Sequence, residues 1–226
     1  MKRERAMAHK LAVVVPYRDR EPHMRFFVPF MFNFLTNQEI DHRIVIVEQH
    51  KHEKLFNRAK LMNVGYDIAK NDCDYFVFHD VDLIPESADY SYPKCPTHMS
   101  AYCSQFNYQL PYETIFGGVS MFTKEDFIKV NGYSNEYWGW GAEDDDMYNR
   151  CEREGTGFER RPNRYNSLAH EKQTLTQQDY MKNIEKLQQQ KAGQKNHRED
   201  GLNTLQYTLI AEQPLGFTAR KYTVSI

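Results

Sequence analysis

The run Phe76–Pro85 most constrains the fold, because it joins an apolar segment to two closely spaced acids. Its first half is rich in residues that favour β-structure and predicts a buried strand. Asp80 and Asp82 follow, and alternate residues of an extended chain point the same way, so both carboxylates are expected to face one site. Adjacent anions repel unless a cation lies between them, and Mn²⁺ or Mg²⁺ with a phosphate would suit such a site. The alternative is an ordinary turn after a strand, which Asp and Pro favour.

The segments before this strand predict the nucleotide-binding half of an α/β fold. Short β-branched runs predict strands, and apolar residues at helical spacing predict helices between them. The order strand, helix, strand, helix, strand is typical of such units, whose functional groups gather at the carboxyl ends of the strands. The strands are expected at Leu11–Pro16 and Arg43–Val47, and the helices at His23–Gln38 and Leu55–Ala69.

Arginines stand at two suitable positions for a phosphate group. Arg18 and Arg20 follow the first strand directly, and Arg58 lies near the start of the second helix. Guanidinium groups bind phosphate through paired hydrogen bonds, and helix N-termini also attract anions. The alternative for Arg18 and Arg20 is a solvated loop without a ligand.

A second chemical cluster spans Trp138–Asp146, where Trp-Gly-Trp-Gly-Ala precedes four acids. If Glu143 begins a helix that runs to about Glu154, acids in its first turn are favoured by the helix dipole, which explains the acids without any function. It does not explain two tryptophans interleaved with glycines. Trp faces bind the apolar faces of sugars, and carboxylates accept hydrogen bonds from hydroxyls or act as a general base.

The rest of the second half predicts shorter elements. Gly117 and Gly118, which allow close backbone approach, lead into a short apolar strand. A helix is expected over Lys124–Asn131, closed by Gly132. Polar residues fill Lys172–Glu199, which predicts a surface helix or a mobile lid ordered by ligand.

Two features near the C-terminus complete the sequence pattern. His170 lies in a polar stretch, either as a surface residue or as a nitrogen ligand to a metal. Leu202–Leu209 predicts a closing strand with Leu205, Tyr207 and Leu209 on one face.

The composition excludes several classes of protein. The 226 residues fit one domain, and a net charge of −2 gives no indication of a nucleic-acid or membrane-surface partner. No apolar run approaches the roughly 20 residues of a transmembrane helix, and no signal peptide is evident. The four cysteines form no Cys-x-x-Cys pair, so a zinc site is not expected. Cys73 and Cys95 flank the aspartates and are either bridged or free buried thiols.

Five runs in this order resemble the β-1,4-galactosyltransferase family, glycosyltransferase family 7. They are Phe56–Lys60, Asp80–Leu83, Phe116–Ser120, Trp138–Asp146 and Asp200–Leu205. The resemblance implies a GT-A fold, an α/β domain whose mixed central sheet is flanked by helices. It also implies an inverting, Mn²⁺-dependent transferase with Mg²⁺ as the alternative ion, moving Gal or GalNAc from a UDP-sugar to O4 of an acceptor sugar. Under this resemblance residues 1–226 form a single domain, with a disordered tail over 1–9 and a mobile lid over about 166–190.

The resemblance also implies roles for individual residues on the donor side. Asp82 and His170 would ligate the metal, and Trp140 would lie between the donor and acceptor sugars. The other residues expected at the donor are Pro16, Tyr17, Arg18, Arg20, Phe56, Arg58, Asp80, Val81 and Ile115.

On the acceptor side, the resemblance makes Asp144 the catalytic base. A hydroxyl nucleophile needs a carboxylate within hydrogen-bond reach, and inversion needs only one such base. The other residues expected at the acceptor are Tyr112, Ala142, Glu143, Asp145, Lys186 and Leu187.

Three departures from the family pattern affect specificity and location. A further family metal ligand falls here at Ser167 or Leu168, neither a good Mn²⁺ ligand. Ile115 replaces the tyrosine of galactose-specific members, and a smaller apolar residue there implies room for the N-acetyl group of UDP-GalNAc. Typical members are anchored in the Golgi membrane, so the Golgi lumen is expected if an anchor precedes this chain; otherwise a soluble protein is expected, with its compartment open.

The acceptor and two other classes of protein remain open. Lys186–Leu187 favours a terminal β-GlcNAc acceptor, whereas Asp89–Pro93 resembles the xylose-accepting branch of proteoglycan linker synthesis. A non-catalytic sugar-binding protein would keep the fold without turnover. A metal-dependent nucleotidyl- or phosphohydrolase would need several carboxylates converging on one metal.

Overall fold

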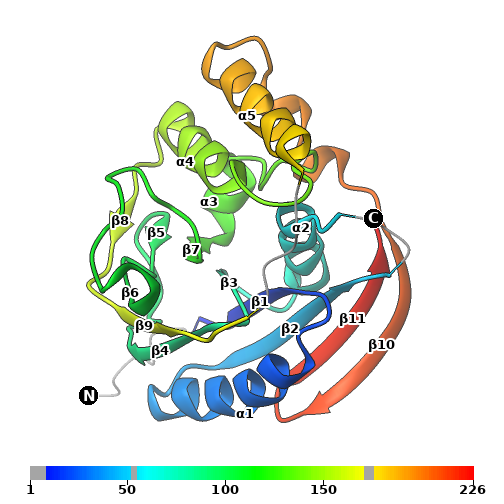
Figure 1. Ribbon diagram of the computed structural model, residues 1–226. Coiled ribbons are helices and arrows are strands. Elements are labelled where there is room, and N and C mark those ends of the chain that lie inside the picture. Colours follow the sequence, from blue (N-terminus) through cyan, green and yellow to red (C-terminus); the bar gives the residue numbers. More distant parts are fainter. Residues whose placement is uncertain (1–8, 52–54, 171–175) are drawn as a thin grey trace, which may run out of the picture.

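The computed structural model describes residues 9–51, 55–170 and 176–226 and shows a mixed α/β fold (Figure 1). The main sheet has eight strands in the order β10-β11-β2-β1-β3-β7-β5-β8. Strands β11, β2, β1 and β3 are mutually parallel, while β10 and β7 run antiparallel to their neighbours. Its strands are β1 (Leu11–Tyr17), β2 (His42–Gln49), β3 (Tyr75–His79), β5 (Thr97–His98), β7 (Val119–Thr123), β8 (Glu159–Arg160), β10 (Thr208–Gly216) and β11 (Ala219–Ser225).

A small second sheet and the helices complete the described architecture. The small sheet has the order β4-β9-β6. Its strands are β4 (Leu83–Ser87), β6 (Tyr102–Cys103) and β9 (Arg164–Ser167). The α-helices are α1 (Glu21–Asn37), α2 (Arg58–Ala69), α3 (Lys124–Lys129), α4 (Glu143–Glu154) and α5 (Gln177–Lys191), and the 3₁₀ helices are η1 (Ser104–Phe106), η2 (His197–Glu199) and η3 (Leu202–Thr204).

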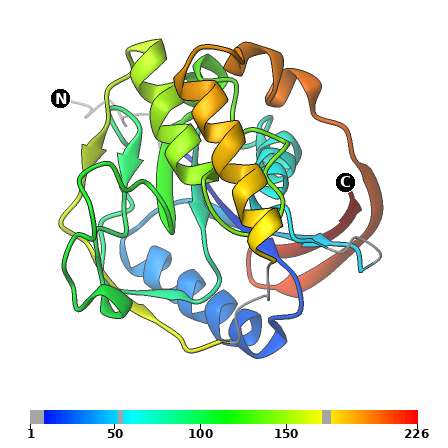
Figure 2. The same cartoon turned by 45° about the horizontal axis from the view of Figure 1, so that its top comes forward.

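The core lies on both faces of the parallel strands, because alternate residues of β1 point to opposite sides. Val13 and Val15 pack in the cluster that includes Phe27 of α1, whereas Val14 packs with Leu61 of α2. Accordingly, α1 and α2 lie on opposite sides of the sheet in Figure 1. Gly65 lets α2 approach β1 closely, since a Cβ there would collide with Val14. Figure 2 shows α4 and α5 side by side.

The predicted α/β class is confirmed, as are the strands and helices of the first half within a few residues. One boundary differs: α2 begins at Arg58 rather than Leu55, because Asn57 caps it by accepting a hydrogen bond from the Lys60 N–H at 2.9 Å. The helix expected from Glu143 to Glu154 has those bounds.

The extended geometry expected at the paired aspartates is wrong. β3 ends at His79, and the Leu83 N–H donates to the Asp80 carbonyl at 3.2 Å, which closes a turn. Strand β4 then pairs with β9. The apolar residues Leu83 and Ile84 lie in β4 of this second sheet. The run Phe76–Pro85 therefore contains two strands rather than one strand and a loop.

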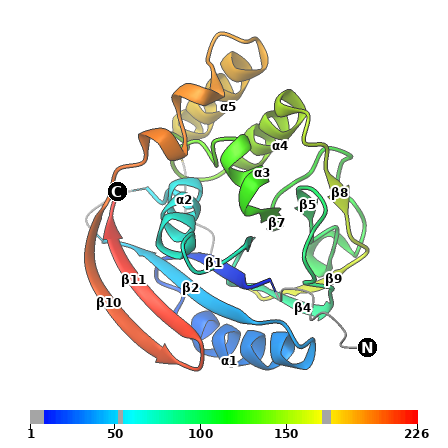
Figure 3. The same cartoon turned by 180° about the vertical axis from the view of Figure 1, so that it is seen from behind.

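The closing strand expected over Leu202–Leu209 is also wrong. Residues Leu202–Thr204 form η3, and Leu202 and Leu205 pack against the core cluster around α2. Leu205, Tyr207 and Leu209 alternate as in a strand, but the strand begins only at Thr208. It forms a hairpin with β11 at the edge of the sheet, seen from behind in Figure 3.

Several remaining expectations concern the cysteines, the termini and the membrane. All four cysteines are free thiols, so Cys73 and Cys95 are not bridged. The expected tail over 1–9 lies outside the described residues except for His9, and the expected lid over 166–190 includes residues 171–175, which are also outside them. Both stay predictions, as does the single-domain organisation. Within the described ranges, none of the helices combines the length and apolar character needed to cross a membrane.

Candidate active site

Arg58 lies at the centre of the site, where it joins three acids from two distant segments. Its Nε donates to Asp80 Oδ1 at 2.6 Å and its Nη1 donates to Asp144 Oδ1 at 2.8 Å. The Glu143 carboxylate is 3.6 Å from the same Nη1. The first residue of α2 therefore links the end of β3 to the start of α4.

The glycine pair lets these segments meet. Arg58 Nη2 and the Asp80 N–H both donate to the Gly118 carbonyl, each at 3.2 Å. A Cβ on Gly117 would lie 2.5 Å from Asp144 Oδ2, so the carboxylate rests directly against this backbone. Close backbone approach is the property that the paired glycines predicted.

Burial, together with the excess of negative charge, raises the pKa of two of the acids. Burial, followed by the neighbouring Asp144, raises the pKa of Glu143 to about 8, although Arg58 opposes this. Burial also raises the pKa of Asp80 to about 6; Arg58 opposes this, whereas Asp82 and Asp144 reinforce it. Asp82 and Asp144 thus act on one carboxylate, as expected if both open onto the same site.

Asp82 and His170 converge from different segments, as a shared metal would require. Asp82 Oδ2 lies 3.2 Å from His170 Nε2. Two adjacent ligands about 2.1 Å from an octahedral ion are about 3 Å apart, so the pair fits Mn²⁺ or Mg²⁺. Oxygen and imidazole donors also suit these ions. Among the described residues, no cluster of three or more His, Cys, Asp or Glu could hold a metal, so phosphate oxygens and water would supply the other ligands.

Arg20 contacts the other ring nitrogen of His170. Its Nη2 lies 2.9 Å from His170 Nδ1, and since a guanidinium can only donate, Nδ1 accepts. A neutral ring then carries its hydrogen on Nε2, directed at Asp82. For Nε2 to hold a metal together with Asp82, this hydrogen would have to lie on Nδ1 instead, which requires Arg20 to release that nitrogen.

The Trp-Gly-Trp loop lies beside the expected donor residues. The Gly139 N–H donates to the Phe56 carbonyl at 2.7 Å, and the Arg18 guanidinium lies 5.3 Å from the centre of the Phe56 ring. Trp140 is 68 % exposed and stacks on Tyr180 of α5, with ring centres 6.0 Å apart. This forms an open aromatic surface of the kind that sugars contact.

The remaining expected acceptor residues divide into two groups. Tyr112 donates to Asp145 at 3.3 Å near Asp144. Ala142 and Leu187 are buried together with Tyr137, and Lys186 donates to the Glu136 carbonyl. Ala142 and Leu187 therefore pack within the protein, whereas Lys186 is half-buried, and contact of these three residues with an acceptor stays a prediction.

Four of the expected donor residues are buried or half-buried, and two of them also make hydrogen bonds within the protein. Tyr17 is buried and its hydroxyl donates to Glu21 at 3.2 Å, and Val81 is buried in the core under α1. Pro16 is buried within β1. Ile115 is half-buried, and its carbonyl accepts from Arg160.

Comparison with known proteins decides the family. A family model described as the N-terminal region of glycosyl transferase group 7 matches residues 3–96. One described as the N-terminal domain of galactosyltransferase matches residues 97–172. This chain belongs to the β-1,4-galactosyltransferase family, glycosyltransferase family 7.

Relatives and solved structures agree with this family. β-1,4-Galactosyltransferase 1 of Bos taurus is 37 % identical over 231 residues, covering 91 % of this chain and 52 % of that protein. β-1,4-Galactosyltransferase 4 of Homo sapiens is 44 % identical over 148 residues, covering 63 % of this chain and 42 % of that protein. This chain thus spans about half the length of the curated relatives it matches.

The structural neighbours confirm the GT-A glycosyltransferase fold. The catalytic domain of Drosophila β-1,4-galactosyltransferase 7 in complex with xylobiose has a TM-score of 0.78 and 28 % identity. The match covers 96 % of this chain and 94 % of that one. A mutant of the same enzyme in complex with manganese, UDP-Gal and xylobiose gives the same values.

Sequence reasoning missed two parts of this family 7 site. Tyr180, which extends the Trp140 surface, lies in a polar helix without any local signal. Asn135 joins the Asn57 cap to the C-terminal motif: its carbonyl accepts from Asn57 at 2.8 Å and its Nδ2 donates to the Gly201 carbonyl at 2.7 Å. The Asp200–Leu205 run indicates that this part of the chain matters, but its sequence does not show that Asn135 is the residue it contacts.

Proposed function

We propose that this chain is an inverting glycosyltransferase that moves Gal or GalNAc from a UDP-sugar to O4 of a β-linked acceptor sugar, with GlcNAc as the first candidate acceptor. The observation that carries the proposal is the Arg58 bridge, which brings Asp144 to the aspartate pair at the end of β3. This contact supports a single site in which Asp144 would act on the acceptor and the aspartate segment would face the diphosphate.

The chain's own residues would divide the reaction between them. Arg58 would leave its carboxylate partners for the diphosphate, and Asp144, once released, would accept the proton of the acceptor hydroxyl. Trp140 would cover the sugars and limit access of water. Mn²⁺ held by Asp82 and His170 would neutralise the charge that develops on the leaving diphosphate. Manganese is supported by the solved complex of the Drosophila relative.

The donor and the acceptor each have two candidates. UDP-Gal is supported by the complex of that relative and UDP-GalNAc by Ile115. A terminal GlcNAc was favoured from the sequence, whereas xylose is favoured by the xylobiose bound to the structural neighbour. A xylose-accepting galactosyltransferase is therefore the second candidate function.

A screen of both donors against both acceptors, with and without Mn²⁺, tests the function. We expect UDP release that requires an acceptor sugar and a divalent ion. Release without acceptor would indicate a hydrolase, and binding of UDP-sugar without release would indicate a sugar-binding protein. The hydrolase lacks structural support, because no cluster of three metal-binding carboxylates occurs in the described part of the chain.

The compartment is a further proposal. We propose the Golgi lumen because the chain belongs to a family whose typical members act there. Its test is the location of the tagged full-length protein in its own cells, where a location outside the secretory pathway would contradict the proposal.

A further inference from the structure

A line of buried polar side chains runs behind the aspartate pair. His79, Tyr90 and Tyr165 have no solvent-exposed surface. The Tyr165 hydroxyl donates to the Tyr90 hydroxyl at 3.0 Å, and the Tyr90 hydroxyl lies 2.9 Å from His79 Nε2. His79 Nδ1 lies 2.9 Å from the carbonyl oxygen of Asp80. A carbonyl only accepts, so Nδ1 donates, and Nε2 of the neutral ring accepts from Tyr90.

This line connects the two segments that bear the expected metal ligands. His79 ends β3 and precedes the turn that contains Asp82, whereas Tyr165 lies in β9, shortly before His170. The backbone joins the same segments, since the Leu168 N–H donates to the Asp82 carbonyl at 2.8 Å. The spacing between Asp82 and His170 therefore depends on how β9 sits against the end of β3.

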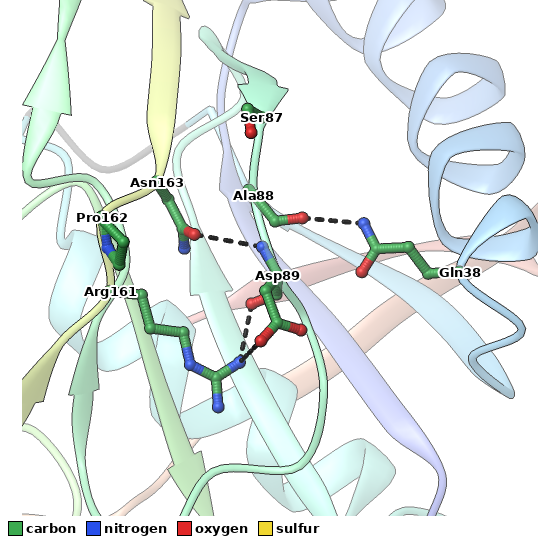
Figure 4. A pocket seen from close by; sticks show the side chains of 7 residues that line it. All are labelled: Gln38, Ser87, Ala88, Asp89, Arg161, Pro162 and Asn163. Atoms are coloured by element: carbon green, nitrogen blue, oxygen red, sulfur yellow. Dashed lines mark hydrogen bonds and ion pairs between the residues drawn. The ribbon is translucent and has the colours of Figure 1, made fainter.

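The loop that carries Tyr90 is held from both sides (Figure 4). Gln38 donates to the Ala88 carbonyl at 2.8 Å and accepts from the Tyr90 N–H at 3.1 Å. Asn163 accepts from the Asp89 N–H at 3.1 Å, and Arg161 donates to the Asp89 carbonyl at 2.8 Å. The same residues line a hollow of about 450 Å³, and their polar groups hold the loop in place.

Stability alone does not account for this arrangement. Buried polar groups cost free energy unless each is paired, and apolar side chains of similar shape can replace a paired set with little loss. Paired groups do impose one orientation on the segments that they join. The His79 ring is further held by Phe27, whose ring centre is 5.0 Å away at a steep angle.

We propose that Tyr90 is a positioning residue for the metal site: through His79 and Tyr165 it sets the turn at Asp82 against the segment of His170. The inference rests on the proposed function, because it assumes that these two residues share a divalent ion. Tyr90 touches neither the ion nor the substrates and acts through its neighbours.

The test compares Tyr90→Phe with Tyr75→Phe. Tyr75 is a matched control, because it is also buried and its hydroxyl donates to the Tyr90 carbonyl at 3.0 Å, outside the line. Loss of a direct hydrogen-bond partner of a metal ligand typically weakens metal binding by about 10- to 100-fold, and the lower end of that range applies to Tyr90, which acts through His79. We expect a rise of that size in the Kd for Mn²⁺ in Tyr90→Phe, measured on the protein without substrates by electron paramagnetic resonance, and less than about a threefold rise in Tyr75→Phe.

The possible outcomes distinguish failure of the positioning role of Tyr90 from failure of the proposed glycosyltransferase function. If the wild type binds Mn²⁺ and Tyr90→Phe binds it equally well, or if both variants weaken it equally, the positioning role is overturned. If the wild type binds no Mn²⁺, the proposed function itself fails. Should Tyr90→Phe not fold, Tyr165→Phe carries the test against the same control, because it removes the donor at the β9 end and keeps the bond between Tyr90 and His79.

Discussion

Arg58 is one cation among three carboxylates, and this imbalance governs the chemistry at the scale of single residues. In the described structure it holds Asp144, the expected base, against the expected donor segment. The guanidinium occupies an oxygen of the Asp144 carboxylate, so transfer requires Asp144 to exchange this partner for the acceptor hydroxyl. Two predictions test Asp144 and its neighbour Glu143, and a third tests Ile115.

Asp144→Asn should lower kcat by about 10²- to 10⁴-fold, the usual contribution of a general base. Binding of the UDP-sugar should change little, because Asp144 is expected to contact the acceptor hydroxyl rather than the donor. Steady-state kinetics and calorimetry measure the two effects. Asp145→Asn is the control on the same helix turn, bonded to Tyr112, and should act mainly on the KM of the acceptor. Unchanged turnover in Asp144→Asn would remove Asp144 as the base.

Glu143→Gln should alter how stability depends on pH. Burial and Asp144 raise the folded pKa of Glu143 to about 8, above its usual value near 4.3. The folded state therefore holds this proton more tightly, and the wild type loses stability as pH rises through that range, by at most about 1.4 kcal/mol per pH unit. Relative to the wild type, the free energy of unfolding of Glu143→Gln should therefore increase between pH 5 and pH 8.

Urea unfolding at these two pH values, without metal, measures the difference. Glu152→Gln, on the exposed side of the same helix, is the control. Its free energy of unfolding should change between the two pH values by the same amount as that of the wild type. A Glu143→Gln curve that also runs parallel to the wild type would contradict the shifted pKa.

Ile115→Tyr should move donor preference from UDP-GalNAc toward UDP-Gal. The larger side chain would fill the space proposed for the N-acetyl group, and one misfit in an apolar pocket changes preference by about 10- to 200-fold. The ratio of kcat/KM for the two donors measures the shift. An unaltered ratio would refute the proposed pocket.

At the scale of elements, the helix termini place the charged groups. α2 begins at Arg58 because Asn57 caps it, and α4 begins at Glu143 with the acids in its first turn. The bounds of α4 were predictable from its acids and its closing Gly155. The start of α2 was not, because Leu55 and Phe56 look helical in the sequence while Asn57, through Asn135, depends on a loop far along the chain.

Asn57→Ala should therefore lower both stability and activity. Loss of an N-cap costs about 1–2 kcal/mol, and a frayed first turn would displace Arg58. Thr123→Ala is the matched control, since Thr123 caps α3 in the same manner without touching the site. Both variants should lose similar stability in thermal melts, but only Asn57→Ala should lose kcat. Equal kcat in the two variants would show that the cap does not position Arg58.

At the scale of the whole molecule, the site is a meeting of three distant parts. The turn after β3 brings Asp80 and Asp82, α4 brings Asp144, and the segment after β9 brings His170. The family motifs made this grouping predictable as a resemblance, but not the contact of Arg58 with Asp144, which depends on packing across the sheet. The closing strand is predicted too early in the chain because Leu205 and Tyr207 alternate like a strand while packing as an irregular segment, and β11 is not predicted at all.

A ligand that joins these parts should stabilise the whole fold. Mn²⁺ with UDP at about 100 times the Kd should add about 2.7 kcal/mol to the free energy of unfolding, and a chelator should remove the metal's share. Asp82→Asn should lose the response to Mn²⁺. Asp41→Asn, an exposed acid paired with Lys10, should keep it. Thermal melts measure all four conditions, and a response retained in Asp82→Asn would exclude Asp82 as a ligand.

The bare backbone at Gly117 makes one kind of damage hard to detect. The three atoms nearest to a methyl group there all belong to the Asp144 side chain, and turning that side chain aside is easier than moving the strand. Such a variant would have the melting temperature, elution volume and light scattering of the wild type but no catalytic activity. Screens of sequence variants that rank harm by loss of folded protein would record position 117 as harmless.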